Sequence, residues 1–371
     1  MRRIALLGST GSIGTTTLGV LSRHREVFEV AALVAGSNAA MLREQVATWQ
    51  PAYSALVRGD VACGFATGPE TLVEAATRPD VDIVVNAVVG AAGLEATLAA
   101  LGAGKRVALA NKETLVTAGA LVAAAARAGG GELVPIDSEH SAVLQCACSQ
   151  NAKPSRLILT ASGGPFRTWD RERVRAATVA EALNHPTWIM GAKITVDSAT
   201  LANKALEVIE AHFLFDLPYD AIEVVVHPQS IVHAFVEFPD GSVLAQVGYP
   251  SMEVPILYAL THPARRADTG VPRYDPVTGG DLTFEPLRRD DFPTFDIGVG
   301  AGRQGGTAPA VFNAANEVAV AAFLAGRIPF GRIPEVIEHA LRHHDGSAAD
   351  SLDAVRGADR AARCHAEEAM T

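Results

Sequence analysis

The stretch RIALLGSTGSIG at residues 3–14 decides the fold. An apolar run is followed by three glycines in the spacing GxxGxxG and then by a helix-like segment. The order strand, glycine loop and helix is the context that a dinucleotide-binding site requires, because glycines let the backbone approach a pyrophosphate and the helix N-terminus offers free N–H groups. The usual spacing is GxGxxG, so the loop alone leaves open a tight turn without a ligand.

Similar apolar runs recur through the first 136 residues. They are rich in Val, Ile, Leu and Ala and do not alternate with polar residues, which is the pattern of parallel strands buried on both faces. Helix-like segments at 94–101 and 113–128 lie between them. This alternation predicts an α/β fold with a doubly wound parallel sheet. The expected strands are residues 3–7, 30–34, 53–57, 82–88, 106–110 and 132–136.

After residue 136 the pattern changes to longer helices and separate strands, which predicts a second, α+β domain. Pro and Gly pairs between residues 261 and 281 indicate a linker. Ala-rich segments from about residue 308 to the C-terminus predict helices. The strands expected in this half are residues 156–160, 192–196, 221–226 and 230–238.

Composition excludes several classes of protein. The chain has 371 residues, 49% of them hydrophobic, enough for two or three folded domains. A net charge of −10 argues against a general nucleic-acid binder. The longest apolar runs fall far short of the roughly 20 residues that cross a bilayer. The four cysteines form no CxxC pair, so we expect reduced thiols in a cytoplasmic protein, with no zinc site and no disulfide framework.

The end of the second expected strand carries Gly36, Ser37 and Asn38. A site selective for NAD usually places an acid at this point, against the ribose 2′-hydroxyl. No acid is present, so NADP is permitted. No Arg or Lys is present either, so NADP is not demanded.

Two carboxylates, Asp137 and Glu139, follow the last strand of the first half. In an extended segment, residues two apart point to the same face, so the pair can share a cation. Carboxylates without cysteine partners suit Mg²⁺ or Mn²⁺, and Glu207 is a candidate third ligand. The alternative is a solvated acidic loop with His140 as an ordinary partner.

A helix is expected to begin at Ser198, which can cap it. Asn203, Lys204 and Glu207 then fall on one side of that helix. A cation, an amide and a carboxylate on one face suit a substrate with a phosphate at one end and metal-bound oxygens at the other. The alternative is an exposed Lys–Glu pair.

Two loops complete the set. Ser162 is followed by two glycines, so backbone amides and a hydroxyl are available to bind an anion. His185, Trp188 and Met190 form an apolar surface with one titratable group.

Taken together, these stretches resemble the 1-deoxy-D-xylulose 5-phosphate reductoisomerase family of the non-mevalonate isoprenoid pathway. The matching segments run in family order from residue 8 to residue 324. They are GSTGSIG, AGSN, NAVVGAAGL, LANKETLV, PIDSEHSA, TASGGPFR, NHPTWIMGAKITVDSATLANKALEVIEA, VHPQSIVH and NAANEVAVAAFL.

The resemblance implies NADPH as cofactor together with Mn²⁺ or Mg²⁺, with Co²⁺ as a further candidate. It implies an NADPH-binding domain over residues 1–136, a catalytic domain over 137–264 with a lid at 162–191, a linker at 265–290 and a helical domain over 291–371. The implied cofactor contacts are Thr10, Gly11, Ser12, Ile13, Gly36, Ser37, Asn38, Asn111, Glu113 and Gly191. The implied metal ligands are Asp137, Glu139 and Glu207. The implied substrate contacts are Lys112, Ser138, Glu139, Ser162, His185, Trp188, Ser198, Asn203, Lys204 and Glu207, of which Lys112, Glu139 and His185 are the implied catalytic residues.

One position departs from the family. Many members carry a basic residue where this chain has Ser37, which leaves the strength of its NADPH preference open.

The implied reaction rearranges a ketose phosphate, 1-deoxy-D-xylulose 5-phosphate, to an aldehyde and reduces it with NADPH to 2-C-methyl-D-erythritol 4-phosphate. The sequence does not choose between a retro-aldol/aldol route and an α-ketol shift. The resemblance also implies a homodimer formed through the second domain. Two alternatives are an ordinary NAD(P)-dependent dehydrogenase without a metal and a nucleotide-sensing module without activity. The filled acid positions and Lys112 favour the reductoisomerase.

Overall fold

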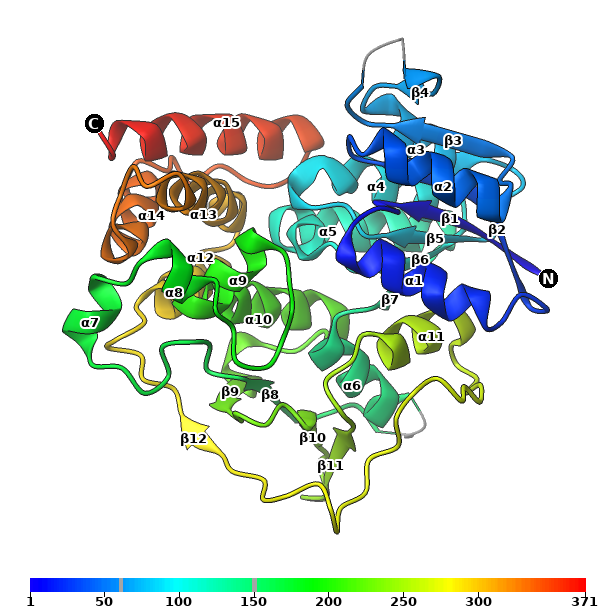
Figure 1. Ribbon diagram of the computed structural model, residues 1–371. Coiled ribbons are helices and arrows are strands. Elements are labelled where there is room, and N and C mark those ends of the chain that lie inside the picture. The colour runs from blue at the N-terminus through cyan, green and yellow to red at the C-terminus, as the bar shows by residue number, and fades with distance from the viewer. Residues whose placement is uncertain (60–62, 149–151) are drawn as a thin grey trace. The chain divides into compact units, whose positions relative to one another are not determined.

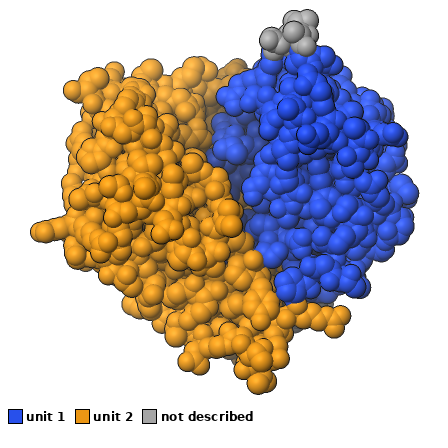
Figure 2. Space-filling view, viewed as in Figure 1, with its two compact units in different colours: residues 1–114, 121–141, 251–272 blue, residues 115–120, 142–250, 273–371 orange. Residues whose placement is uncertain are grey.

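The computed structural model describes residues 1–59, 63–148 and 152–371 and divides into two compact units (Figures 1 and 2). Unit 1 comprises residues 1–114, 121–141 and 251–272, and unit 2 comprises residues 115–120, 142–250 and 273–371. None of the helices among the described residues combines the length and the apolar character needed to span a bilayer. The expected division into residues 1–136, 137–264, 265–290 and 291–371 stays a prediction, since the two units divide the chain more coarsely.

Unit 1 is built on a seven-stranded sheet in the order β4-β3-β2-β1-β5-β6-β7. All of its strand pairs are parallel, as the buried apolar runs predict. The six expected strands are confirmed, and a two-residue edge strand, β4, is added. The bounds are β1 Arg2–Leu7, β2 Phe28–Ala35, β3 Tyr53–Leu56, β4 Ala66–Thr67, β5 Ile83–Asn86, β6 Arg106–Leu109 and β7 Glu132–Pro135.

The strand order of this sheet reverses between β1 and β5. Because crossovers between parallel strands are right-handed, the helices that follow β1 and β2 cover one face and those that precede β5 and β6 cover the other. In agreement, α3 packs against α4, and α1 packs against α11. The helices are α1 Ser12–Ser22, α2 Ala39–Trp49, α3 Glu70–Thr77, α4 Leu94–Gly102, α5 Lys112–Gly129 and α11 Glu253–Thr261, with a 3₁₀ turn η2 at Gly90–Gly93.

Gly8 permits a close approach of backbone at the carboxyl ends of β1 and β5. Its φ is +85°, and a Cβ atom there would lie 2.4 Å from the Ala87 carbonyl oxygen. At Gly14, in α1, a Cβ atom would lie 2.2 Å from the Gly8 carbonyl oxygen. A side chain at either position would push the loop or the helix away. The glycine loop therefore lies where the strand order reverses, which is where open α/β sheets bind ligands.

Unit 2 contains a five-stranded sheet in the order β11-β10-β8-β9-β12. β8 pairs in parallel with β9, and the other pairs are antiparallel. Its core includes the fully buried rings of Phe166 and Phe312. The strands are β8 Arg156–Ala161, β9 Ile222–Val226, β10 Val232–Glu237, β11 Val243–Val247 and β12 Glu285–Pro286.

Helices make up the rest of unit 2, with the C-terminal helices α13, α14 and α15 packed on one another. This confirms the expected C-terminal helical part. The helices are α6 Ser138–Ala147, which begins in unit 1, α7 Arg171–Arg175, α8 Val179–Ala182, α9 Ala192–Thr200, α10 Ala202–Phe215, α12 Thr294–Gln304, α13 Ala308–Leu324, α14 Ile333–Arg342 and α15 Leu352–Glu368, with 3₁₀ turns η3 Tyr219–Ala221 and η4 Phe330–Arg332.

The strand expected at residues 192–196 is wrong, because these residues open the helix α9. Ser198 is not a helix cap either, since it lies inside α9. α9 ends at Leu201, which has a left-handed backbone with φ of 61°, and α10 begins at the next residue. The helix that carries the expected substrate residues therefore starts at Ala202.

The segment 251–272 returns to unit 1 and is held there by Asp268. The Arg23 guanidinium donates hydrogen bonds of 2.9 and 2.8 Å to its two carboxylate oxygens, and His24 Nε2 lies 3.2 Å from one of them. The Asp268 side chain is only 3% exposed. Hydrogen bonding from Arg23 lowers the pKa of Asp268 to about 2, against the effect of burial. The carboxylate is therefore a stabilising anion at neutral pH.

We expect Asp268→Asn to lower the free energy of unfolding by about 2 kcal/mol at pH 7, because one pKa unit corresponds to about 1.4 kcal/mol. Since the pKa is lowered in the folded state, this stability is present above the ordinary value of 3.8 and is lost as the pH falls toward 2. Urea unfolding at pH 7 and at pH 3 measures the difference, which should shrink at the lower pH. Asp216→Asn, at a side chain that is 90% exposed, is the control. Equal midpoints of wild type and Asp268→Asn at pH 7 would contradict the assignment.

Candidate active site

The glycine loop places the expected pyrophosphate contacts Thr10, Gly11, Ser12 and Ile13 at the start of α1. Gly11 is the N-cap residue, and no side chain caps this helix end. Gly11 and Ser12 are exposed. The first turn of α1 therefore offers backbone N–H groups to an anion from outside the fold.

Two polar residues, Ser37 and Asn38, follow β2, and the second of them caps the next helix. Ser37 is exposed. The Asn38 side chain accepts a hydrogen bond of 3.1 Å from the Met41 backbone N–H and so caps α2. The Ser37 hydroxyl and the Asn38 amide nitrogen are the groups here that could contact a nucleotide ribose or its phosphate.

The start of α5 is fixed by Asn111. Its side-chain oxygen accepts from the Thr114 backbone N–H, which caps the helix. Its amide nitrogen donates to the carbonyl oxygens of Val88 and Gly90, both at 2.8 Å, and to Glu113 at 2.9 Å. Asn111 thus ties the loop after β5 to the helix after β6, and Glu113 is held beside that loop.

Lys112 and Asp137 form a buried ion pair in unit 1. The Lys112 ammonium lies 2.5 Å from Asp137 Oδ1, and His140 Nδ1 lies 3.1 Å from Asp137 Oδ2. Burial alone would raise the pKa of Asp137, but the Lys112 charge and His140 together hold it well below its usual range. Asp137 is therefore a carboxylate, which is the form that binds a metal ion.

The structure changes the reason why Asp137 and Glu139 lie together. We expected an extended segment, but Ser138 is the first residue of α6. Asp137 directly precedes the helix and Glu139 lies in its first turn, where the helix dipole stabilises carboxylates. The Ser138 hydroxyl donates a hydrogen bond to Glu139. The alternation argument is wrong, although the pair does stand at one helix end.

In unit 2, α10 brings three of the expected residues together. The Asn203 amide donates to Glu207 Oε1 at 2.6 Å. The Lys204 ammonium donates to the Thr160 carbonyl oxygen at 2.6 Å and to Glu207 Oε2. Lys204 and Glu207 are both buried, so this is not the exposed pair of the alternative interpretation.

A second cluster in unit 2 contains Ser162, His185 and Ser198. His185 Nε2 lies 3.0 Å from Ser162 Oγ and 3.2 Å from Ser198 Oγ. Its Nδ1 accepts hydrogen bonds from the backbone N–H groups of Thr187 and Trp188 at 3.1 and 2.9 Å. Nδ1 must then lack a proton, so in the neutral ring Nε2 carries it and donates toward the serines. Burial lowers the pKa of His185, which favours that neutral ring.

The expected lid, residues 162–191, contains only the short helices α7 and α8. Trp188 and Met190 are partly buried. The centroid of the Trp188 ring lies 6.5 Å from that of the His233 ring. Ile189 between them is 99% exposed, and Gly191 is exposed as the N-cap of α9. An exposed apolar side chain in an irregular segment suits a surface that covers a ligand.

The sequence did not single out two buried polar groups. Ser9, inside the glycine loop, has a hydroxyl with no hydrogen-bond partner among the described residues. Asp197 accepts from the Asn316 amide at 2.8 Å and from the Lys193 ammonium at 2.9 Å. Asn316 belongs to the NAANE segment of α13, so that polar pattern inside an apolar helix was the available signal.

The fold and these side chains define a class. A parallel α/β sheet with a glycine loop at its reversal point is the frame of a nucleotide-dependent oxidoreductase. The buried acids and the paired lysines add groups suited to a metal ion and to a phosphorylated substrate. The expected residues fall into a set in unit 1 and a set in unit 2.

Three family models match the chain in order. 1-deoxy-D-xylulose 5-phosphate reductoisomerase matches residues 4–119, its C-terminal domain matches residues 133–215, and a further DXP reductoisomerase C-terminal domain matches residues 247–365. The chain belongs to the 1-deoxy-D-xylulose 5-phosphate reductoisomerase family.

Relatives and solved structures agree over the whole length. The reductoisomerase of Heliobacterium modesticaldum is 50% identical, with 99% of this chain and 97% of that protein covered, and the one of Geobacillus kaustophilus is 48% identical with 100% of both covered. A crystal structure of DOX-P reductoisomerase in complex with NADPH, fosmidomycin and magnesium is 39% identical, has a TM-score of 0.95 and covers 100% of this chain and 98% of that one. The Zymomonas mobilis enzyme in complex with NADPH is 40% identical, has a TM-score of 0.92 and covers 100% and 99%.

We expect His185 to titrate below its ordinary value of 6.5 and to be the Nε2–H tautomer at pH 7, because burial disfavours the cation and Nδ1 accepts two backbone N–H groups. Long-range ¹H–¹⁵N NMR of histidine-labelled protein reports both properties, with His185→Gln to assign the signal. A proton on Nδ1 at pH 7, or a pKa above 6.5, would contradict the hydrogen-bond pattern.

Proposed function

We propose that the two sets of side chains described above carry out the reaction of the family. The chain is an NADPH-dependent oxidoreductase that, with a divalent metal ion, converts 1-deoxy-D-xylulose 5-phosphate to 2-C-methyl-D-erythritol 4-phosphate in non-mevalonate isoprenoid biosynthesis. The observation that carries the assignment of residues is the pair of buried acid–lysine contacts, Lys112 with Asp137 and Lys204 with Glu207.

The glycine loop is the proposed site of the NADPH pyrophosphate, because the uncapped first turn of α1 presents backbone donors. Ser37 is the proposed neutral contact of the ribose 2′-phosphate. The remaining proposed contacts of the cofactor are Gly36, Asn38, Asn111, Glu113 and Gly191. NADPH, when bound, supplies the hydride that reduces the rearranged aldehyde.

The proposed metal ligands are Asp137, Glu139 and Glu207. All three offer carboxylate oxygens, the donors that Mn²⁺ and Mg²⁺ prefer, and no thiolate is among them. Co²⁺ remains a candidate as well. The metal ion, when bound, polarises the substrate carbonyl and holds its neighbouring oxygen atoms. The Lys112 charge keeps Asp137 ionised. The Lys204 ammonium orients Glu207 through its hydrogen bond.

Lys112 is the proposed donor to the substrate oxygen on which negative charge develops, with Ser138 and Glu139 as further contacts. A buried ammonium stabilises such a charge more strongly than one in water.

At the other end of the substrate, the phosphate is assigned to Ser162, Ser198, Asn203 and Lys204. Both serine hydroxyls lie within hydrogen-bond distance of His185 Nε2, and the ring donates from that atom in its neutral form. His185 thereby orients both hydroxyls toward an anion. Trp188 is the proposed apolar cover that excludes water.

The edge strand β11 supports a homodimer as the working form. Val243, Leu244 and Val247 on this strand are exposed, as is Tyr249 just after it. An exposed apolar edge strand is a template for pairing with another strand, and a second copy of the chain is the occupant we propose. We also infer a cytoplasmic location, because all four cysteines are free thiols.

We expect Glu207→Gln to lower kcat by about 100-fold or more while NADPH affinity changes little, because the variant removes one charged metal ligand and leaves unit 1 intact. The assay follows NADPH oxidation with 1-deoxy-D-xylulose 5-phosphate, with and without Mn²⁺. Chelator should abolish turnover and Mn²⁺ should restore it. Glu223→Gln, on the exposed side of β9, is the matched control. Full turnover in chelator would instead favour a metal-independent dehydrogenase, and no turnover with any metal would favour a binding module.

We expect Leu244→Lys to convert a dimer into a monomer, because a charge on the edge strand opposes pairing with a second copy. Sedimentation velocity measures the change. Ile189→Lys is the control, since it places the same charge on an exposed apolar residue of another segment. A wild-type monomer, or a dimer that survives the substitution, would overturn the proposed interface.

A further inference from the structure

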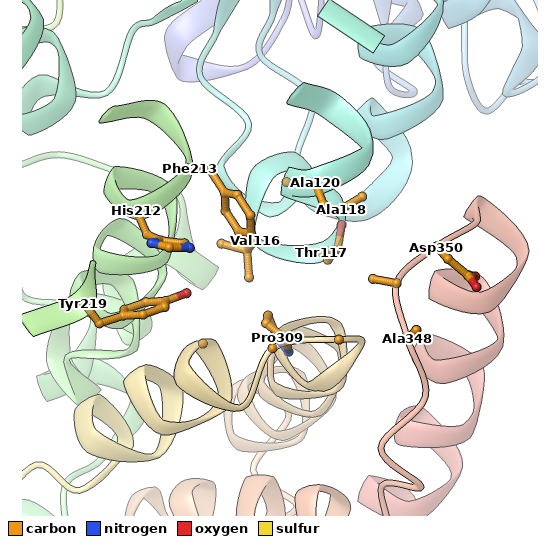
Figure 3. A pocket seen from close by; sticks show the side chains of 15 residues that line it. Val116, Thr117, Ala118, Ala120, His212, Phe213, Tyr219, Pro309, Ala348 and Asp350 are labelled. Carbon is orange, nitrogen blue, oxygen red and sulfur yellow. The ribbon is translucent and has the colours of Figure 1, made fainter. Parts of the chain in front are cut away.

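A cavity of about 440 Å³ lies within unit 2, and none of the residues that line it is assigned to substrate or cofactor. Figure 3 shows His212 and Tyr219 at one end and Ala348 and Asp350 at the other, with Phe213, Val116 and Pro309 between them. Its volume falls within the range of roughly 300–1,000 Å³ that is typical of small-molecule sites.

The cavity lies where α5 leaves its helical path. Ala118 has φ of −145° and ψ of 33°, which interrupts the helix. At the next residue, Gly119, a Cβ atom would lie 2.3 Å from Phe213 Cδ2, so the ring of Phe213 packs directly on the α5 backbone. The wall formed by α5 and α10 is therefore close-packed and preformed.

The opposite wall is held by Thr307. Its hydroxyl lies 2.8 Å from His344 Nε2 and 2.9 Å from Ser347 Oγ, and its backbone N–H donates to the Ser347 carbonyl oxygen at 3.0 Å. These bonds position the chain just before Ala348, which lines the cavity. The site is built from separate segments that are each fixed in place.

One end of the cavity carries the polar side chains of His212 and Tyr219. His212 Nδ1 lies 2.6 Å from the Leu217 carbonyl oxygen and donates to it, so in the neutral ring Nε2 is an acceptor. The ring stacks on Tyr219, with centroids 4.4 Å apart and planes inclined by 20°. Burial raises the pKa of Tyr219 to about 12, so its hydroxyl keeps the proton.

The charge of the lining selects the ligand. The described residues around the cavity include one carboxylate, Asp350, and neither lysine nor arginine. Without a cation, the cavity disfavours a phosphate ester or another anion, which separates it from the substrate and cofactor sites. Apolar and aromatic walls favour a planar apolar body.

We propose that this cavity binds a small, uncharged, planar aromatic ligand with one N–H or O–H group directed at the His212–Tyr219 end. α10 connects the site to the substrate residues, because His212 follows Glu207 by five residues, about 7.5 Å along the helix axis. A ligand held against His212 and Phe213 restrains the last turn of that helix. A ligand in the cavity therefore changes turnover without displacing NADPH or the sugar phosphate. This effect on turnover, unlike the binding itself, rests on the proposed function.

Indole is the probe that tests the site, since it is planar, uncharged and has one N–H group. The chain contains five tyrosines, so protein labelled with 3-fluorotyrosine gives five ¹⁹F signals, and Tyr219→Phe assigns one of them. Indole should shift the Tyr219 signal saturably and leave the other four in place. A Tyr219 signal that does not move at millimolar indole would overturn the proposal.

A variant with a larger side chain in the cavity tests whether indole binds there. Ala348→Trp should weaken indole by about tenfold or more, since about 1.4 kcal/mol of lost contact is a factor of ten. Ala361→Trp, on the exposed face of α15, is the control and should bind as wild type does. The four unmoved tyrosine signals report whether each variant is folded, and Ala349→Phe on the same rim is a second filling variant. Unchanged affinity in folded filling variants would refute the site.

Steady-state kinetics test the link to catalysis. Saturating indole should change kcat without competing with NADPH or with the sugar phosphate. Binding at Tyr219 with unchanged kcat would refute the link through α10. Binding at Tyr219 in a protein with no reductoisomerase turnover would refute the proposed function and leave the cavity assignment standing.

Discussion

The buried pairing of Lys112 with Asp137 is the interaction on which the ligand-binding end of unit 1 depends. Lys112 is the first residue of α5, after β6, and Asp137 is the last residue before α6, after β7. Each buried charge is tolerated because the other offsets its loss of hydration, so removal of one partner leaves an uncompensated charge. The neighbouring Asn111 extends the connection to the loop after β5. Two consecutive side chains thus join the ends of three adjacent strands.

Unit 2 also pairs its buried charged side chains. Lys204 is engaged with a backbone carbonyl and with Glu207. A phosphate that binds Lys204 must therefore share it with these partners, and a metal ion on Glu207 competes with the same ammonium. In the proposed site, metal and phosphate binding would be coupled through this one lysine, because each ligand changes the charge that the other meets.

The sequence was sufficient for the parallel sheet, and the site residues that it named stay a prediction. Continuous apolar runs specify strands that are buried on both faces, and a glycine loop between a strand and a helix needs no tertiary information. It was insufficient at residues 192–196, where the β-branched Ile194, Thr195 and Val196 favour a strand by intrinsic propensity. Burial in a helical environment overrides that propensity. The sequence also showed no sign of the left-handed backbone at Leu201, because Gly or Asn usually occupies that conformation. Contacts such as Asn316 with Asp197 join residues far apart in the chain and leave no local pattern.

Unit 1 is assembled from three stretches of chain, and the last of them ends at residue 272. α11, which packs against α1, β6 and β7, follows the last strand of the sheet by about 120 residues. At a synthesis rate of about 5–20 residues per second, the ribosome delivers this helix roughly 6 to 24 s after β7. During that interval the apolar surface that α11 will cover stays open on the nascent sheet. The first unit to begin emerging is therefore completed only after most of the second sheet has been made, and an apolar surface left open for that interval is prone to aggregation.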